Sequence, residues 1–313
     1  NARLLYNHIM EKQKFTGAEY GGITFSGAVI VYAALSLIFA VICSFTGFSD
    51  NGGDVYIYLN YLVSPVAITI ALFVVTKFAR QPLRRSLLVK MPPGAAAKWC
   101  AVAVLLAFGM LFSLSWLNIG FERLLRLIGY DASPSYFPDL SGGRVALALF
   151  VMALLPALFE EALFRGVLLQ SIKEETGHLN AVLLCGMCFA LFHASALQTI
   201  YQFACGCAFA LLAIRSRSVL PGMLAHFLNN ATIIILQACG LDTSGSLFDW
   251  APLWAAVLVT VLSALSLAGA VAVMAADKTP LEKPVKGGVF AFFIAAAAGI
   301  VVLAVLWVAG FFG

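Results

Sequence analysis

The chain contains nine stretches that are each apolar over about the length of a membrane-crossing helix. A helical span needs about 20 mostly apolar residues to cross the hydrocarbon core of a bilayer. Hydrophobic residues make up 62% of the sequence and charged residues 11%, too few charges to cover a water-facing surface. The sequence therefore predicts an all-α, polytopic transmembrane bundle of eight or nine spans. By hydropathy the candidate spans are residues 24–47, 57–78, 95–118, 145–172, 179–196, 198–214, 219–239, 252–275 and 288–311.

The charges of the connecting loops predict the orientation of the bundle. Basic residues precede the first span and lie toward the ends of, or after, the second, fourth, sixth and eighth, whereas the alternate loops carry Asp50, Asp54, Asp242 and Asp249. Cytoplasmic loops are enriched in Lys and Arg, so the N-terminus is expected in the cytoplasm of a multi-pass cell-membrane protein. The basic residues concerned are Arg3, Lys12, Lys14, Lys77, Arg80, Arg84, Arg85, Lys90, Arg165, Lys173, Arg215, Arg217, Lys278, Lys283 and Lys286.

The loop 119–144 is the exception, because it carries Arg123, Arg126 and Arg144 on the opposite side. Its stretch NIGFERLLRLIGY has apolar residues at helical spacing, which predicts an amphipathic helix lying along the outer surface.

Nothing in the sequence separates a soluble domain from the membrane part. There is no internal repeat and no low-complexity linker, so residues 1–313 are expected to form a single membrane domain with a cytoplasmic segment at 1–22. No basic domain indicates a nucleic-acid partner. The seven cysteines lie in or beside apolar segments, so Cys185 and Cys188 of the CxxC are interpreted as packing residues rather than a redox pair.

Ionisable residues inside a span are costly, about 2.5–3.5 kcal/mol each on insertion scales, and here they gather in three spans. In the fourth, Glu161 and Arg165 stand at i and i+4 and are predicted to form an ion pair that supports structure. Glu160 has no such local partner, so it is expected to face the bundle interior as a general base. Pro156 is expected to bend the helix just before the pair.

The fifth and seventh spans add Phe189, His193, His226 and Asn230. Because His226 and Asn230 stand at i and i+4, they can aim two donors at one point, as an oxyanion hole requires. Hydrogen bonding between helices is the alternative use of such residues in membranes. At about 1.5 Å per residue, Glu160, His193 and Asn230 all lie about 20 Å from the predicted cytoplasmic ends of their spans. This common depth predicts a site.

Glu160-Glu161-x-x-x-Arg165, Phe189-x-x-x-His193 and His226-x-x-x-Asn230 together resemble the three motifs of the CPBP (Abi) family, which includes type II CAAX prenyl endopeptidases and bacterial proteins of bacteriocin processing and self-immunity. The resemblance covers about residues 145–240, the predicted catalytic core. It implies that Glu160 activates a water that His193 helps to hold, that His226 and Asn230 stabilise the oxyanion, and that Glu161 and Arg165 are structural. It further implies a cavity open to the cytoplasm and a membrane-embedded or lipidated peptide substrate.

The chemistry of the site has two alternatives. Glu160, His193 and His226 could hold a zinc ion with one open position. However, the sequence contains no HExxH, and an amide at i+4 from His226 suits an oxyanion better than zinc, which favours a metal-free glutamate mechanism without a cofactor.

Rival functions fit less well. Ser195 lacks the setting of a serine intramembrane protease, and Asp54 and Asp131 lie in loops rather than in two spans as an aspartyl type needs. A proton-coupled carrier predicts inverted repeats, which are absent. A non-proteolytic scaffold or bacteriocin-immunity protein that uses the same residues structurally stays open, as do the substrate and the oligomeric state.

Overall fold

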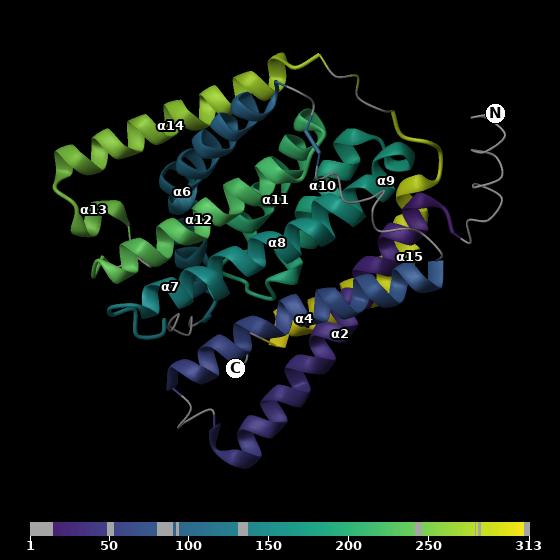
Figure 1. Ribbon diagram of the computed structural model, residues 1–313, viewed down its shortest axis with the longest axis horizontal. Coiled ribbons are helices and arrows are strands. Elements are labelled where there is room, and N and C mark those ends of the chain that lie inside the picture. Colours follow the sequence, from purple (N-terminus) through teal and green to yellow (C-terminus); the bar gives the residue numbers. More distant parts are fainter. Residues whose placement is uncertain are drawn as a thin grey trace.

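The computed structural model describes residues 15–48, 53–79, 90–91, 94–130, 137–241, 246–278, 280 and 283–309, and every regular element in these ranges is helical (Figure 1). The protein is a polytopic helical membrane bundle, as predicted. The separate helices are α2 (Gly17–Thr46), α4 (Gly53–Ala79), α6 (Ala96–Leu127), α10 (His178–Phe192), α11 (Thr199–Ser216), α12 (Leu220–Ala238), α13 (Leu247–Trp250), α14 (Leu253–Ala276) and α15 (Gly288–Ala309). Between α6 and α10, one continuous helical segment is divided into α7 (Arg144–Ala148), η1 (Leu149–Leu154), α8 (Leu155–Glu161), η2 (Ala162–Leu168) and α9 (Leu169–Thr176).

Each of the nine predicted spans contains a helix, but fewer of these helices are membrane spans by length and composition alone. Among the described residues, seven are long and apolar enough to cross a membrane. The two others are α10, which has 15 residues, and α12, which has 19 residues but carries His226, Asn229 and Asn230. These are two of the helices that bear the predicted site, so polarity at the site is what weakens their hydropathy signal.

The first helix begins earlier than the predicted residue 24, because capping rather than hydropathy sets its start. Thr16 and Glu19 form a capping box, in which the Glu19 amide donates to Thr16 Oγ1 at 3.2 Å and the Thr16 amide donates to Glu19 Oε2 at 2.9 Å. The Glu175 carboxylate accepts from the amides of Gly17 at 2.6 Å and Ala18 at 3.1 Å. This fixes the start of α2 to the end of α9.

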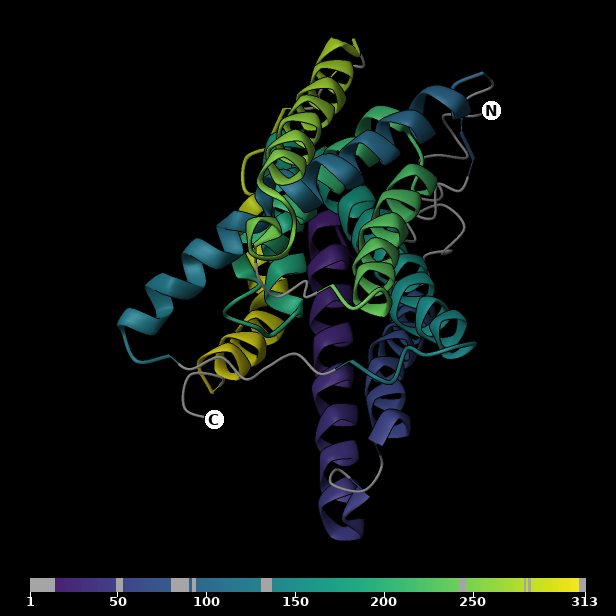
Figure 2. The same cartoon turned by 90° about the vertical axis from the view of Figure 1, so that its left-hand side faces the viewer.

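The amphipathic stretch after the third span is not a separate surface helix, which corrects the prediction. Helix α6 runs without interruption from Ala96 to Leu127, because Gly120 is tolerated within it and no proline interrupts it. Near its end, Arg126 Nη2 and Glu122 Oε1 are 2.7 Å apart in an exposed i,i+4 pair. Figure 2 shows this end of α6 projecting away from the bundle.

The helix that carries Glu160 is irregular in the way that Pro156 predicts. Proline has no N–H, so the Met152 carbonyl lacks its usual helical donor. The chain responds with a π-helical turn, η1, immediately before α8, and a second π-helical segment, η2, follows Glu161. Such wide turns in α-helices are frequent at functional sites. The irregular segment therefore surrounds the two glutamates on both sides.

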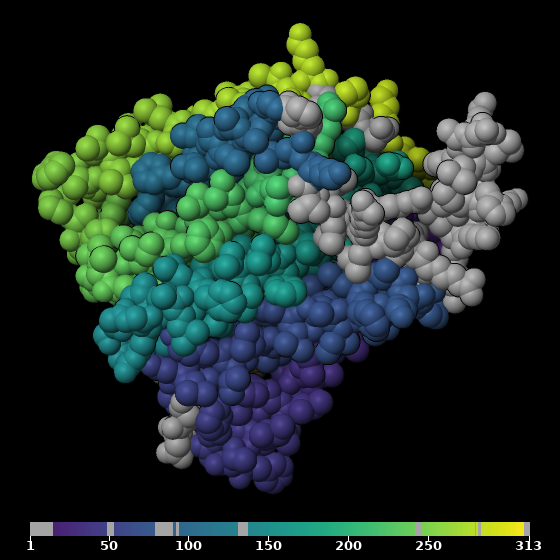
Figure 3. Space-filling model, in the orientation of Figure 1, coloured from purple at the N-terminus to yellow at the C-terminus, as the bar shows by residue number. Residues whose placement is uncertain are grey.

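This segment lies inside the bundle between helices from both halves of the chain. Helix α8 packs against α12 on one side and α4 on the other (Figure 1). In the space-filling view the same segment, in teal, forms a band between α12 in green and α4 in blue (Figure 3). Outside this core, α15 packs on α2 and α14 packs on α6.

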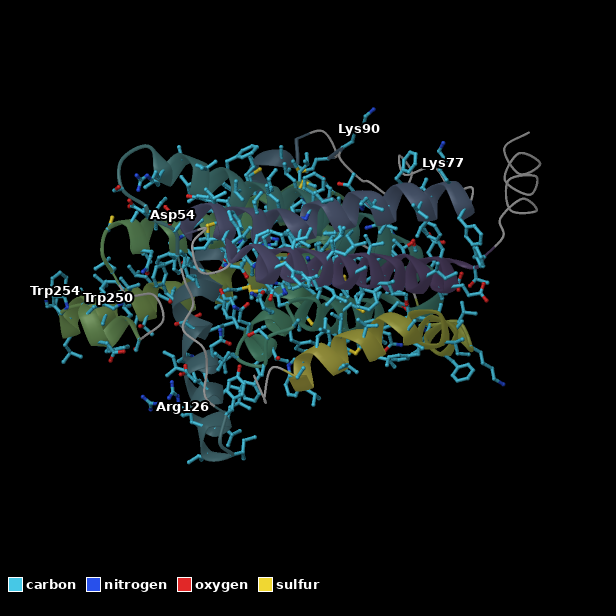
Figure 4. All side chains as sticks on the ribbon, turned by 90° about the horizontal axis from the view of Figure 1, so that it is seen from below. Asp54, Lys77, Lys90, Arg126, Trp250 and Trp254 are labelled. Atoms are coloured by element: carbon cyan, nitrogen blue, oxygen red, sulfur yellow. The ribbon has the colours of Figure 1, made fainter. Side chains whose placement is uncertain are left out.

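The two ends of the bundle differ in their labelled residues, as the predicted topology requires. Figure 4 shows Lys77 and Lys90 toward one end and Asp54, Trp250 and Trp254 toward the other. Trp is enriched at membrane interfaces, and basic residues favour the cytoplasmic side. Several residues used in the orientation argument lie outside the described ranges: Arg3, Lys12, Lys14, Asp50, Arg80, Arg84, Arg85 and Asp242.

Helices α10 and α11 meet through glycines. A Cβ on Gly206 would lie 2.7 Å from the Gly186 Cα, a backbone atom that cannot move aside alone. The neighbouring Cys185 and Cys188 are buried, and the Cys185 thiol donates to the Phe164 carbonyl at 3.2 Å. These cysteines therefore occupy packing positions in this closely spaced pair of helices.

We expect Gly206→Ala to destabilise the protein by about 1–3 kcal/mol, because the added methyl group must push α10 and α11 apart. The measurement is the denaturation midpoint in detergent micelles. Gly120→Ala is the matched control, since a Cβ there meets nothing within 4 Å, and it is expected to raise helix stability by up to about 1 kcal/mol. Equal effects of the two substitutions would contradict the close-packing argument.

Candidate active site

A buried ion pair lies at the centre of the site. Arg165 Nη1 donates to Glu161 Oε1 at 2.7 Å, and both side chains are fully buried. Arg165 Nη2 also donates to the Gly206 carbonyl on α11 at 3.0 Å. The i,i+4 pair predicted from the sequence is thus present, and it links two helices.

Three aromatic rings surround the guanidinium group. The Arg165 Cζ lies 4.5 Å from the ring centroid of Phe189, 5.3 Å from Phe209 and 5.8 Å from Phe164. A cation over the face of an aromatic ring is stabilised by the ring's negative face. These rings therefore offset part of the cost of burying a charged side chain.

Both predicted histidines are held through Nδ1. His226 Nδ1 lies 3.0 Å from Glu161 Oε1, and His193 Nδ1 lies 2.8 Å from the Phe189 carbonyl. An ionised carboxylate and a carbonyl oxygen only accept hydrogen bonds, so Nδ1 carries the proton in each ring. A neutral imidazole then presents Nε2 as an acceptor, the tautomer that a hydrogen-bonded Nδ1 normally sets.

This geometry changes the role predicted for His226. The sequence led us to expect His226 and Asn230 as two donors aimed at one point. In the structure, Nε2 of His226 becomes a donor only when the ring is an imidazolium, which the Glu161 carboxylate would stabilise. His226 is anchored to the helix of the fourth predicted span by a partner 65 residues away, which sequence spacing could not reveal.

Phe189 connects the parts of the site. Its ring centroid lies 4.8 Å from that of His193 and 5.7 Å from that of His226, edge-on in both cases. Phe209 stacks on the other side of His226 at 5.8 Å. A single aromatic residue thus contacts Arg165 and both imidazoles, which explains the value of a large rigid ring at the first position of Phe189-x-x-x-His193.

Glu160 differs from its neighbour Glu161. It is 8% exposed, and its Oε2 is buried without a hydrogen-bond partner in the described part of the chain. Its charge acts on His193 and on two tyrosines of the first two spans, Tyr32 and Tyr61. A buried unpartnered carboxylate oxygen is a site for a water or a polar substrate group, because leaving it empty is costly.

The donor set for a metal was compared with the predicted zinc alternative. Among the residues that the structure describes, no group of three His, Cys, Asp or Glu side chains is arranged to hold a metal ion, and Glu160, His193 and His226 do not form one.

Asn230 is joined to two residues that the sequence analysis missed. Its Oδ1 accepts from Asn229 Nδ2 at 3.3 Å, and Asn229 Oδ1 accepts from the Tyr201 hydroxyl at 2.7 Å. Asn230 Nδ2 lies 3.5 Å from the Met152 carbonyl, the group that Pro156 leaves without its helical donor. The Asn229–Asn230 doublet inside a span was the available signal, whereas nothing in the sequence indicated Tyr201.

Gly222, at the start of α12, allows this helix to approach the ion pair. A Cβ at this position would lie 2.9 Å from Glu161 Oε2. Glu161 cannot turn away cheaply, because Arg165 and His226 both hold its other oxygen. Glycine is therefore the residue that fits here.

Gly222→Ala is accordingly expected to cost about 1–3 kcal/mol of stability through overpacking, and to displace His226 with Glu161. The measurement is thermal unfolding in micelles together with the cleavage assay described below. An unchanged unfolding midpoint with unchanged turnover would show that α12 does not need this close approach.

Comparison with known proteins assigns this part of the chain. Residues 142–232 match the family model described as type II CAAX prenyl endopeptidase Rce1-like. A 93-residue segment is 27% identical to "Putative membrane peptidase YdiL" of Bacillus subtilis (strain 168), and it covers 30% of this chain and 38% of that relative. No solved structure matches.

The matched residues contain Glu160, Glu161, Arg165, His193, His226 and Asn230, within the predicted core 145–240. A membrane protease at the level of the family is what both relatives support. Through residues 142–232, the chain belongs to the Rce1-like (CPBP) family of membrane proteases.

Proposed function

We propose that this protein is an intramembrane endopeptidase in which Glu160 activates the attacking water. The single observation that carries the proposal is the contrast between the two glutamates. Glu161 is fully engaged by Arg165 and His226, whereas Glu160 is buried with an unpartnered oxygen. A carboxylate held there only for structure would have a partner, because burial without one is costly.

The proposed reaction uses this chain's own side chains. Glu160 takes a proton from a water that His193 Nε2 helps to hold, and the resulting hydroxide attacks the peptide carbonyl carbon. The Asn230 amide, and His226 when it is protonated, stabilise the oxyanion that forms. As the carbon–nitrogen bond breaks, the protonated Glu160 gives its proton to the leaving amine. No metal and no cofactor takes part.

We propose a membrane-embedded or lipidated peptide as the substrate class. The helices around the site are apolar spans, so a peptide carrying a lipid or an apolar segment can approach from the bilayer. The family name points to prenylated substrates, and leader peptides share the same apolar character. With Lys77 and Lys90 toward one end of the bundle, we place that end and the N-terminus at the cytoplasmic side of the cell membrane, with the cavity opening there.

A non-proteolytic scaffold or immunity protein is the second candidate, favoured by the fully satisfied contacts among Glu161, Arg165 and His226. Quantitative proteomics of membrane peptides separates the two functions, by comparing cells that carry wild type with cells that carry Glu160→Gln. We expect wild-type cells to contain cleavage products that are absent with the variant. Identical peptide profiles at equal protein levels would support the scaffold, and metal analysis of the purified protein would reveal bound zinc.

A further inference from the structure

We propose that Tyr201 is a positioning residue that orients the Asn230 amide through Asn229. The inference rests on the proposed function, because it assigns a reason for holding this amide in one orientation. It concerns residues of α11 and α12 outside the three motifs, and it follows from the direction of the hydrogen bonds between them.

The direction is fixed at each step. Asn229 Oδ1 can only accept, so the Tyr201 hydroxyl donates to it at 2.7 Å. The amide nitrogen of Asn229 then faces Asn230 Oδ1 and donates to it at 3.3 Å. If Asn230 turned its amide over, its own NH₂ group would face the NH₂ group of Asn229, and two donors would meet. The path therefore favours the orientation in which Asn230 Nδ2 points away from Asn229.

The first member of the path is itself held firmly. Tyr201 is 6% exposed and Asn229 is 6% exposed, so neither can exchange its partner for bulk water. The thiol of Cys205, one helical turn beyond Tyr201, hydrogen-bonds the same hydroxyl. A buried polar chain that is satisfied at each step fixes side-chain orientation more strongly than one isolated contact.

The far end of the path is held loosely, as a donor for a developing charge should be. Asn230 Nδ2 is 3.5 Å from the Met152 carbonyl, at the outer limit of a hydrogen bond. An amide nitrogen has two hydrogens, and the described residues show no partner for the second. Tyr201 and Asn229 thus set the orientation of Asn230, while its NH₂ group stays available to an oxyanion.

The kinetic test uses Tyr201→Phe, which removes only the hydroxyl. The probe is an internally quenched peptide with a farnesylated cysteine followed by three residues, assayed in proteoliposomes beside an unprenylated membrane-spanning peptide of the same design. We expect kcat to fall about 10-fold with KM nearly unchanged, the lower range for losing an indirect supporting contact. In an Asn230→Ala background the same substitution should have no further effect on kcat, because its target is gone.

Tyr58→Phe is the matched control. Tyr58 lies on α4, and its hydroxyl is buried without a hydrogen-bond partner in the described residues, so its removal should leave kcat and KM unchanged. If Tyr201→Phe lowers kcat equally with and without Asn230, Tyr201 does not act through that amide and the proposal is overturned.

A stability measurement tests the hydrogen-bond path independently of turnover. Tyr201→Phe and Asn229→Leu are each expected to lower the thermal midpoint by about 2–4 °C, and the double variant should lose no more than Asn229→Leu alone. Strictly additive shifts would overturn the relay, whatever the activity. Coupled shifts in a wild-type protein that cleaves neither probe would instead count against the proposed function, and with it against the catalytic purpose of the relay.

Discussion

Glu160→Gln should lower the rate of peptide hydrolysis by about 10²- to 10⁴-fold, the range that general acid–base groups contribute. The substitution keeps the size of the side chain and removes its ability to take a proton from water. Because Glu160 Oε2 has no partner in the described residues, the change breaks no hydrogen bond of that oxygen, and the fold should survive. The measurement is kcat on the quenched peptides in proteoliposomes, with the thermal midpoint recorded beside it.

Glu122→Gln is the control for that experiment, since Glu122 is a glutamate at the projecting end of α6 and pairs only with the exposed Arg126 in the contacts described above. It should leave the rate unchanged. A Glu160→Gln protein that is folded and cleaves as fast as wild type would exclude Glu160 as the base.

Arg165→Met is expected to have the largest effect on stability, a loss of about 3–5 kcal/mol, because it leaves a buried carboxylate without its counter-charge. Glu161 is fully buried and would keep only His226 as its printed polar neighbour. The loss should appear as a lower midpoint in reversible unfolding by sodium dodecyl sulfate in mixed micelles, with a reduced rate of cleavage from displacement of His226.

The same substitution at Arg126 gives a matched comparison. Arg126 forms an i,i+4 pair with Glu122 of the same spacing, but its side chain is 54% exposed. Exposed pairs contribute about 0.2–1 kcal/mol, so Arg126→Met should shift the midpoint little. Similar losses at both positions would contradict the importance of burial in the Glu161–Arg165 pair.

The sequence predicted the spans well, because membrane crossing depends on apolar length, which is a local property. Helix ends were predicted less well. The start of α2 depends on the Thr16 cap and on Glu175, which is distant in sequence, and α6 continues beyond its apolar part because nothing between residues 118 and 127 stops a helix.

The site was predictable only where its contacts are local. The Glu161–Arg165 pair follows from i,i+4 spacing, and it is present. The contacts of Glu161 with His226, and of Asn229 with Tyr201, join separate helices. Such contacts depend on how helices rotate and approach one another, and Gly222 and Pro156 control this through close packing and a wide turn. The catalytic roles of the residues stay predictions until the substitutions are measured.

The wide turns on either side of α8 also constrain how this gene can change in length. A π-helical turn holds one residue more than an α-helical turn, so losing a single residue from Leu149–Leu154 would restore regular winding. It would also rotate everything beyond by about 100° relative to what precedes it. The two glutamates would then face a different neighbour, so a one-codon deletion in this membrane helix should be tolerated less well than most of its point substitutions.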